Sequence, residues 1–304
     1  MTYTILVATT LSYEALDYLN TAGDVNLRIV QPDDITATFA EADALIARDD
    51  VTIDAEMLAA GKHLKVIGRA GTGLAGIDLE AATARGVIVM NTPGTNAMSA
   101  AEYTFAILLA LARQVIPGHL DLKAGLWDRN AHYGVELYAK TLGLIGLGRV
   151  GRRVAERAIA FGMDVLAYDP YVSELQVNDL RVKLVGLDEL LSRSDVVSLH
   201  CALTPETFHI LDVESLAMVK PGALIVNVAH GTMIDEYALA DMIRSGRVAG
   251  AALDVYDHEP PQSSPVIGLA NVVHTPHMGD ATIEARRDVS LQIVRQVLDA
   301  LRGT

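Results

Sequence analysis

The feature that most constrains the fold is a glycine motif set between an apolar strand and a helix. Residues 141–145 (TLGLI) predict a short buried strand, Gly146, Gly148 and Gly151 follow at G-x-G-x-x-G spacing, and a helix is expected over residues 152–161. The first glycine permits a tight turn, the second lets backbone approach a pyrophosphate, and the third lets the helix pack on the strand. The start of the helix offers free N–H groups to phosphate. Together these features predict a dinucleotide-binding domain.

A second apolar run, residues 163–168, ends on Asp169, about twenty residues beyond the glycines. A carboxylate at this position accepts hydrogen bonds from the ribose hydroxyls and repels a 2′-phosphate. We therefore expect NAD rather than NADP as the cofactor. The strand, glycines, helix, second strand and acid stand in register, which distinguishes the motif from an accidental turn.

The rest of the chain alternates short apolar segments with segments of helical periodicity, which predicts parallel sheets. We expect an α/β protein of two Rossmann-like, doubly wound domains, residues 1–96 plus 277–304 and residues 97–276. The first domain lacks a glycine set after its first strand, so the cofactor is assigned to the second. The predicted strands are residues 3–8, 26–30, 44–47, 65–68, 87–90, 141–145, 163–168, 182–185, 196–200, 223–227, 248–252 and 272–274. The predicted helices are residues 13–20, 54–60, 79–85, 99–115, 152–161 and 280–301, and residues 120–138 form an amphipathic stretch before the glycine motif.

Composition narrows the classes of partner and the compartment. The formal net charge of −14 argues against nucleic acid and anionic membrane as partners, but it does not bear on a small anionic substrate. The single cysteine, Cys201, excludes an internal disulfide and suits a reducing compartment. No signal peptide is visible at the N-terminus, and the longest apolar run, residues 105–112, is too short to span a bilayer. We expect a cytoplasmic location.

Further stretches resemble a known family. They are residues 68–73 (GRAGTG), 89–93 (VMNTP), 220–236 (KPGALIVNVAHGTMIDE), 249–260 (AGAALDVYDHEP) and 274–279 (HTPHMG). With the glycine motif, they make the chain resemble the D-isomer-specific 2-hydroxyacid dehydrogenase family over essentially its whole length, and within it the phosphoglycerate dehydrogenase branch, without a regulatory C-terminal domain. The resemblance implies an active-site cleft between the two domains and homodimers formed through the central helical region. The buried helix at residues 99–115 would then lie between domains or at a subunit contact.

The resemblance also implies a reaction, which is reversible hydride transfer between NAD(H) and a small D-2-hydroxyacid, an EC 1.1.1-type oxidation. It makes His277 the acid/base and Glu259 the carboxylate that holds it, a pairing that raises the imidazole pKa and fixes its tautomer. His230 stands where the family carries an arginine that clamps the substrate carboxylate. Imidazole lacks the two parallel donors and the permanent charge of a guanidinium. Their loss costs about 2–4 kcal/mol of binding free energy, or about a hundredfold in rate. We expect weak turnover that improves below about pH 6.5 as His230 charges.

Binding residues follow from the resemblance as well. The implied cofactor contacts are Gly146, Gly148, Arg149, Val150, Gly151, Asp169, His200, Cys201, Ala229, Asp254, Gly279 and Thr72. The implied substrate contacts are Arg48, Arg69, Gly71, Thr72 and Gly73. Asp254 is expected to hold the nicotinamide carboxamide and Cys201 to line the adenosine pocket. No third ligand accompanies His274 and His277, so no metal site is expected.

Several departures from the family pattern accompany His230, and they leave alternatives open. Asp49, Ala75, Gly76, Ala202 and Asp280 also differ from the usual residues. Such changes indicate another substrate or weaker dehydrogenase activity, whereas a native or introduced substitution at position 230 of an otherwise ordinary member is the plainer alternative. Two further functions stay open, namely an NAD-binding sensor or interaction protein that has lost turnover, and an NAD enzyme for a phosphonate, phosphite or sulfonate. The sequence identifies neither the anion nor the physiological direction.

Overall fold

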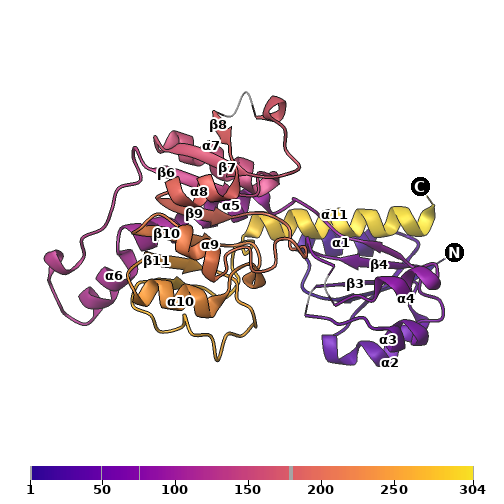
Figure 1. The fold of residues 1–304 in the computed structure, drawn as a ribbon. Helices are drawn as coiled ribbons and strands as arrows, with labels where there is room; N and C mark the ends of the chain where they lie inside the picture. Colours follow the sequence, from indigo (N-terminus) through magenta and orange to yellow (C-terminus); the bar gives the residue numbers. More distant parts are fainter. Residues whose placement is uncertain (1, 49, 75, 178–180, 304) are drawn as a thin grey trace. The chain divides into compact units, whose positions relative to one another are not determined.

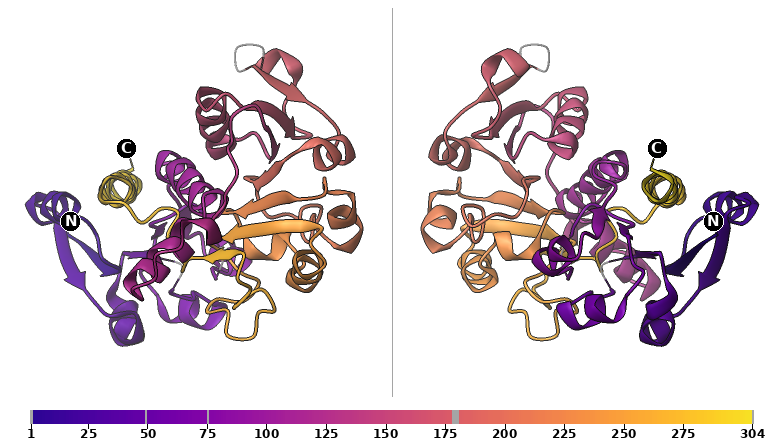
Figure 2. Two further views of the ribbon diagram at one scale, coloured as in Figure 1. Left: turned by 90° about the vertical axis from the view of Figure 1, so that its left-hand side faces the viewer. Right: turned by 90° about the vertical axis from the view of Figure 1, so that its right-hand side faces the viewer.

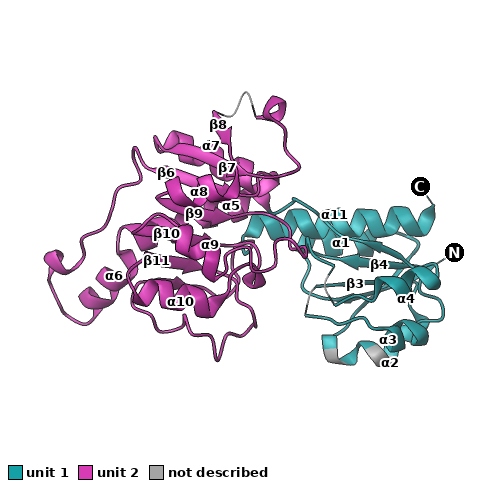
Figure 3. Cartoon of the chain, in the orientation of Figure 1, with its two compact units in different colours: residues 1–96, 281–304 teal, residues 97–280 magenta. Residues whose placement is uncertain are grey.

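The computed structural model describes residues 2–48, 50–74, 76–177 and 181–303, and divides the chain into two compact units (Figures 1 and 3). Unit 1 comprises residues 1–96 and 281–304, and unit 2 comprises residues 97–280. Residues 277–280 therefore group with unit 2 rather than with the first domain as expected from the sequence. Asp49 and Ala75, two of the departures noted above, lie outside the described residues.

Unit 1 contains a five-stranded parallel sheet in the order β2-β1-β3-β4-β5. Alternate side chains of β1 face opposite sides, so that Ile5 and Val7 pack with α1 and α11, whereas Leu6 and Ala8 join a second apolar cluster with Leu58 of α3. The strands are β1 (Tyr3–Ala8), β2 (Val25–Ile29), β3 (Ala44–Ala47), β4 (Val66–Arg69) and β5 (Ile88–Met90), and the helices are α1 (Tyr13–Thr21), α2 (Ile35–Thr38), α3 (Ala55–Ala60), α4 (Leu79–Ala84) and α11 (Ile283–Arg302).

Unit 2 contains a seven-stranded parallel sheet in the order β12-β11-β10-β9-β6-β7-β8. Its strands are β6 (Thr141–Ile145), β7 (Asp164–Tyr168), β8 (Val182–Leu184), β9 (Val196–Leu199), β10 (Ala223–Asn227), β11 (Val248–Leu253) and β12 (Val272–His274). Its helices are α5 (Ala97–Ala112), α6 (Val115–Lys123), α7 (Arg149–Ala160), α8 (Leu187–Arg193), α9 (Val213–Met218) and α10 (Glu236–Arg244). The order reverses direction between β6 and β9, which makes this the switch point where such sheets bind ligands.

Helices cover both faces of the unit 2 sheet (Figure 2). One apolar cluster joins α5 and α7 to the sheet through Leu108 and Val154, and the other joins α8 and α10 through Leu190 and Leu239. This burial on both faces explains why the strands read as continuous apolar runs. The predicted class, two α/β domains with parallel sheets, is confirmed. The cleft between them stays a prediction.

The segment after α5 differs from the prediction. Gln114 adopts a left-handed conformation (φ 54°), so α5 ends before it and α6 begins after it, with Pro117 in its first turn. Proline is tolerated there because the first helical N–H groups have no intrahelical partner, so Pro117 does not terminate the preceding helix. Of the amphipathic stretch over residues 120–138, residues 120–123 lie in α6, and a 3₁₀ turn, Arg129–Ala131, follows. Gly134 passes so close to the end of α5 that a Cβ there would lie 2.3 Å from the Ala112 carbonyl oxygen.

Among the described residues, no single helix is both long and apolar enough to cross a membrane, and only α5 and α6 taken together, bent by 63°, meet those criteria.

Candidate active site

The glycine motif lies at the carboxyl end of β6, beside the end of β9. Gly146 has φ +99°, and a Cβ on it would lie 2.5 Å from the Cys201 nitrogen. A Cβ on Gly151 would lie 2.3 Å from the Gly146 carbonyl oxygen. A Cβ on Gly148, by contrast, would meet no protein atom within 4 Å. The first and third glycines are therefore required by the packing of the protein itself, whereas the second leaves an open cradle of backbone that fits a pyrophosphate.

Helix α7 starts from this cradle without a side-chain cap. Its N-cap is Gly148, so no side chain accepts from the first-turn N–H groups, whereas α1 is capped by Ser12 and α3 by Asp54. Arg149 and Val150 form the first turn, the former exposed and the latter half-buried. Uncapped N–H groups and the positive end of the helix dipole favour an anion at this position.

Asp169 follows β7 and is tied to the glycine loop. Its Oδ2 accepts a hydrogen bond from the Leu147 N–H at 2.8 Å, and its Oδ1 accepts from the Tyr171 N–H at 3.0 Å. Each carboxylate oxygen retains a further lone pair, so the pair of oxygens can still accept from ribose hydroxyls. The glycine loop and Asp169 are thus held as one piece.

His200 and Cys201 follow β9 and lie against the glycine loop. Burial lowers the pKa of His200 to about 3, so its imidazole is neutral, and its Nε2 hydrogen-bonds the Ser198 hydroxyl at 2.8 Å. Burial, with a smaller contribution from the Asp169 charge, raises the pKa of the Cys201 thiol to about 11. A thiol that stays protonated is a poor nucleophile, so this pair lines the loop and offers no covalent chemistry.

His277 and Glu259 form a hydrogen-bonded pair at the carboxyl edge of the unit 2 sheet. The His277 Nδ1–H donates to Glu259 Oε2 at 2.8 Å, and Glu259 Oε1 accepts from the Tyr256 N–H at 3.2 Å. Both side chains are partly exposed, so a substrate can reach the pair. The sequence places these two residues in different loops, after β12 and β11, and the fold brings them together.

Asp254 holds the loop that carries His277. This residue is fully buried, and its carboxylate accepts from the Thr275 hydroxyl at 2.6 Å, the Met278 N–H at 2.8 Å and the Gly279 N–H at 2.7 Å. Its carbonyl oxygen accepts from the His277 N–H at 2.9 Å. His277 itself has φ +53°, a left-handed conformation that costs about 1–2 kcal/mol for an L-residue. The hydrogen bonds of Asp254 offset that cost and fix the imidazole.

His230 follows β10 and is brought to the same edge by its neighbours. Asn227, which is buried, donates from Nδ2 to the His230 carbonyl oxygen at 2.8 Å and accepts from the Ala229 N–H at 3.0 Å. Gly231 abuts the Tyr256 backbone so closely that a Cβ would lie 1.9 Å from the Tyr256 carbonyl carbon. This contact joins the loop after β10 to the loop after β11, on which Glu259 lies.

The His230 imidazole lies within electrostatic range of the pair. Its side chain reaches solvent, but the surrounding protein displaces enough water to lower its pKa. The charge of His277 lowers the pKa further, and the charge of Glu259 raises it. His230 is therefore neutral near pH 7 in the free protein, and it charges at a lower pH than its unperturbed value of about 6.5 would predict.

The remaining candidates lie in unit 1, at the carboxyl ends of β3 and β4. Arg48 follows β3, Gly71–Gly73 follow β4, and the Thr72 carbonyl oxygen accepts from Asn91 Nδ2 at 2.7 Å. Arg69 is only 2% exposed, and its Nη1 and Nη2 donate to the Val51 carbonyl oxygen. The Arg69 guanidinium thus bonds the interior of its own unit, a geometry that favours a structural role for it.

Sequence reasoning missed the residues that position the loops. Asn227, Gly231 and Thr275 were not among the candidates, yet they fix the backbone at His230 and His277. A usable signal existed for Asn227, because an asparagine ending a buried strand commonly bonds the backbone of the turn that follows. The partners of Gly231 and Thr275 are too distant along the chain for such a signal.

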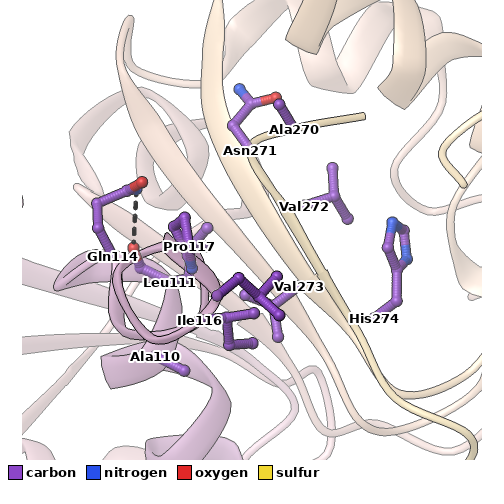
Figure 4. A pocket seen from close by; sticks show the side chains of 11 residues that line it. Ala110, Leu111, Gln114, Ile116, Pro117, Ala270, Asn271, Val272, Val273 and His274 are labelled. Atoms are coloured by element: carbon purple, nitrogen blue, oxygen red, sulfur yellow. Dashed lines mark hydrogen bonds between the residues drawn. The ribbon is translucent and has the colours of Figure 1, made fainter. Parts of the chain in front are cut away.

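Two other observations concern sites elsewhere. Among the described residues, no group of three or more His, Cys, Asp or Glu side chains is arranged to hold a metal ion. Within unit 2, a largely apolar pocket lies between β12 and the α5–α6 bend, where Ile116 and Pro117 face Val272 and Val273 (Figure 4). This pocket is separate from the glycine loop.

Comparison with known proteins identifies the family. Residues 105–279 match the model of the D-isomer specific 2-hydroxyacid dehydrogenase NAD binding domain. The D-3-phosphoglycerate dehydrogenase of Mycobacterium tuberculosis is 48% identical over 271 residues, 89% of this chain and 51% of that protein, so the chain spans about half the length of that relative. The hydroxypyruvate reductase of Thermotoga maritima is 43% identical over 281 residues, 91% of both chains. A crystal structure of a Thermus thermophilus protein superimposes with a TM-score of 0.90 at 38% identity, covering 99% of this chain and 97% of that one.

These matches confirm the resemblance drawn from the sequence and the assignment of NAD to the second domain. The chain belongs to the D-isomer specific 2-hydroxyacid dehydrogenase family, and its residues 105–279 are the NAD-binding domain of that family.

Proposed function

We propose that this protein is an NAD-dependent oxidoreductase that interconverts a small 2-oxoacid and the corresponding D-2-hydroxyacid. The observation that carries the proposal is the 2.8 Å bond between His277 Nδ1 and Glu259 Oε2, held in place by Asp254 in the unit that carries the glycine cradle. In the reducing direction the 2-oxoacid gains a hydride at its carbonyl carbon and a proton at its oxygen. NADH is converted to NAD⁺ and one proton is consumed.

The chain's own residues have separable tasks in this proposal. The Gly148 backbone and the first turn of α7 hold the pyrophosphate, and Asp169 accepts from the ribose hydroxyls. Bound NAD(H) supplies or accepts the hydride at its nicotinamide. The carboxylate of Glu259 fixes the proton of His277 on Nδ1 in the neutral ring, so proton exchange with the substrate oxygen is assigned to Nε2.

The substrate class follows from the relatives, whose names are D-3-phosphoglycerate dehydrogenase and hydroxypyruvate reductase. We place this chain among enzymes of small, hydroxylated three-carbon 2-oxoacids, with hydroxypyruvate as the first to test. The intact imidazole–carboxylate pair favours this function over a sensor that has lost turnover. The test is NADH oxidation with hydroxypyruvate, 3-phosphohydroxypyruvate and glyoxylate, and NAD⁺ reduction with phosphite, both followed at 340 nm. Turnover with phosphite and with none of the 2-oxoacids would contradict the proposal.

A second copy of the chain is the proposed partner. Helix α6 has no buried residue, and the segment that follows it exposes Trp127 (87%) and Tyr133 (81%). Large apolar side chains exposed along one segment are typical of an interaction surface. We expect a homodimer that covers this segment, and light scattering should report twice the mass of one chain. Leu122→Glu, on the exposed part of α6, should shift the protein towards monomer, whereas Leu175→Glu, at a more exposed leucine elsewhere in unit 2, should not.

A further inference from the structure

The carboxyl edge of β10, β11 and β12 contains no permanent positive charge. Residues 228–243, 254–271 and 275–280 follow these strands, are all described, and include neither lysine nor arginine. They include Asp254, Glu236, Asp257 and Glu259. An anion that approaches this edge of unit 2 therefore meets fixed negative charge, and the positive charge available from these segments is that of protonated histidine.

Within unit 2, the arginines nearest to these segments in sequence lie at the other end of the sheet. Arg247 immediately precedes β11 and donates to the Ala217 carbonyl oxygen. Arg244 ends α10, donates to the Pro265 carbonyl oxygen and pairs with Asp241. Both are engaged at the amino end of β11, on the opposite side of the sheet from His230.

His230 is the histidine whose place and surroundings suit this task. It follows β10, its backbone is fixed by Asn227, and the Gly231–Tyr256 contact holds its loop against the one that carries Glu259. Two charged groups of unit 2 act on its imidazole, namely Glu259 from the loop after β11 and His277 from the loop after β12. The other nearby carboxylates are engaged, since Asp254 binds the His277 loop and Glu236 accepts from the Asp257 N–H.

We propose that His230 takes up a proton when an anionic substrate binds, so that this edge of unit 2 acquires its positive charge from solvent and faces the anion with two protonated imidazoles rather than one. The second is His277, which must carry a proton to act as the acid in reduction. The proposal rests on the proposed function only in taking a 2-oxoacid as the anion. It makes His230 a specificity-determining residue, because a neutral ligand of the same shape induces no proton uptake.

The sign of the pH dependence follows from the electrostatics. In the free protein, burial lowers the pKa of His230. A bound carboxylate raises that pKa again, so protons are taken up between the free and the bound value. Anion binding is then strongest below the free pKa and is lost as the pH rises through the bound one. The sequence alone predicts that His230 becomes charged below about pH 6.5. In the unliganded protein, this protonation is shifted to lower pH.

The experiment is calorimetric titration of the NADH-saturated protein with oxamate, an unreactive isostere of a 2-oxoacid. Affinity is measured from pH 5.5 to pH 8.5, and proton uptake is obtained from buffers of different ionisation heat. Where two protons are taken up, the affinity falls about a hundredfold per pH unit at its steepest, and where one is taken up it falls about tenfold. We expect the steeper dependence for the wild type and the shallower one for His230→Gln and His230→Arg.

The variants separate charge from proton uptake. His230→Arg carries a permanent charge, so it should bind oxamate more tightly than the wild type at pH 8 while taking up one proton fewer. His63→Gln, at an exposed histidine before β4 in unit 1, is the matched control and should behave as the wild type.

Equal proton uptake by the wild type and His230→Gln would overturn the inference, and so would an absence of oxamate binding at every pH. The proposed function is judged separately. If His230→Arg binds oxamate with NADH yet reduces none of the 2-oxoacids, the proposed reaction is excluded. The number of protons taken up on oxamate binding still decides the role of His230.

Discussion

Asp254→Asn tests how the fold holds the loop that carries His277, the proposed acid/base. The carboxylate accepts from Thr275 and Met278 through Oδ1 and from Gly279 through Oδ2, at 2.6, 2.8 and 2.7 Å. Asparagine keeps one acceptor oxygen and presents an NH₂ group in place of the other, so at least one buried N–H or O–H faces a donor. Losing a hydrogen bond to a charged group costs about 1.5–3 kcal/mol, and the donor left unsatisfied adds about 1–3 kcal/mol.

We take about 3 kcal/mol as the expected loss of stability, which corresponds to a decrease in Tm of roughly 6–12 °C for a unit of this size. The left-handed backbone at His277 is then no longer held, and a misplacement of the imidazole should lower kcat about 10- to 100-fold. Thermal unfolding by circular dichroism without cofactor measures the first effect, and NADH oxidation at 340 nm measures the second.

The control for this variant is Asp235→Asn. Asp235 caps α10 through a single oxygen, Oδ1, which accepts from Tyr237 and Ala238 N–H. Asparagine caps helices as well as aspartate does, so Tm should change little. An unchanged Tm and kcat in Asp254→Asn would refute the argument that these hydrogen bonds hold the loop. A loss of NADH affinity with Tm unchanged would instead assign Asp254 to the cofactor alone.

Three further predictions address the cofactor cradle, the acid/base pair and buried charge. Gly148→Ala should change Tm little but weaken NADH binding at least tenfold, because its Cβ meets no protein atom and would occupy the cradle. Gly186→Ala, at the N-cap of α8 and also in open space, should change Tm as little and leave NADH binding intact; calorimetry decides. His277→Gln should lower kcat by about 10²–10⁴ with NADH binding retained, and Glu259→Gln should lower it less and shift its pH profile to lower pH; an unchanged kcat in His277→Gln excludes it as the acid. Because burial lowers the pKa of His200 to about 3, the unfolded state binds a proton below about pH 6.5 that the folded state does not. The free energy of unfolding should therefore fall by about 1.4 kcal/mol per pH unit in that range. The Tm of His200→Asn should decline less steeply with acid than that of the wild type, and an equal decline would contradict this origin.

Local patterns were sufficient to predict most of the sheet. The strands at Tyr3–Ala8, Thr141–Ile145 and Ala223–Asn227 have the boundaries predicted, since buried parallel strands are apolar on both faces and end at polar or glycine residues. The region around Gln114 was not predictable in this way. A left-handed glutamine carries no sequence signal, and Pro117 suits the start of a helix as well as the position after its end.

In the candidate site, too, contacts that are local in sequence were predictable and contacts between distant segments were not. The glycine motif and Asp169 are local in sequence, so their spacing was informative. The actual partners of Asp254 lie 21 to 25 residues further along the chain, and those of Arg69 are set by tertiary packing. The charge state of His230 depends on burial and on two other loops, which no spacing rule contains.

The measurement that tests the central claim most directly is single-turnover absorbance at 340 nm after mixing the NADH complex with hydroxypyruvate, for the wild type and for His277→Gln. We predict that the wild type consumes its bound NADH and that the variant retains NADH but consumes it about 10²–10⁴ times more slowly. Equal rates in the two proteins, or no consumption by the wild type at any pH, would contradict the claim that the His277–Glu259 pair serves hydride transfer at this site.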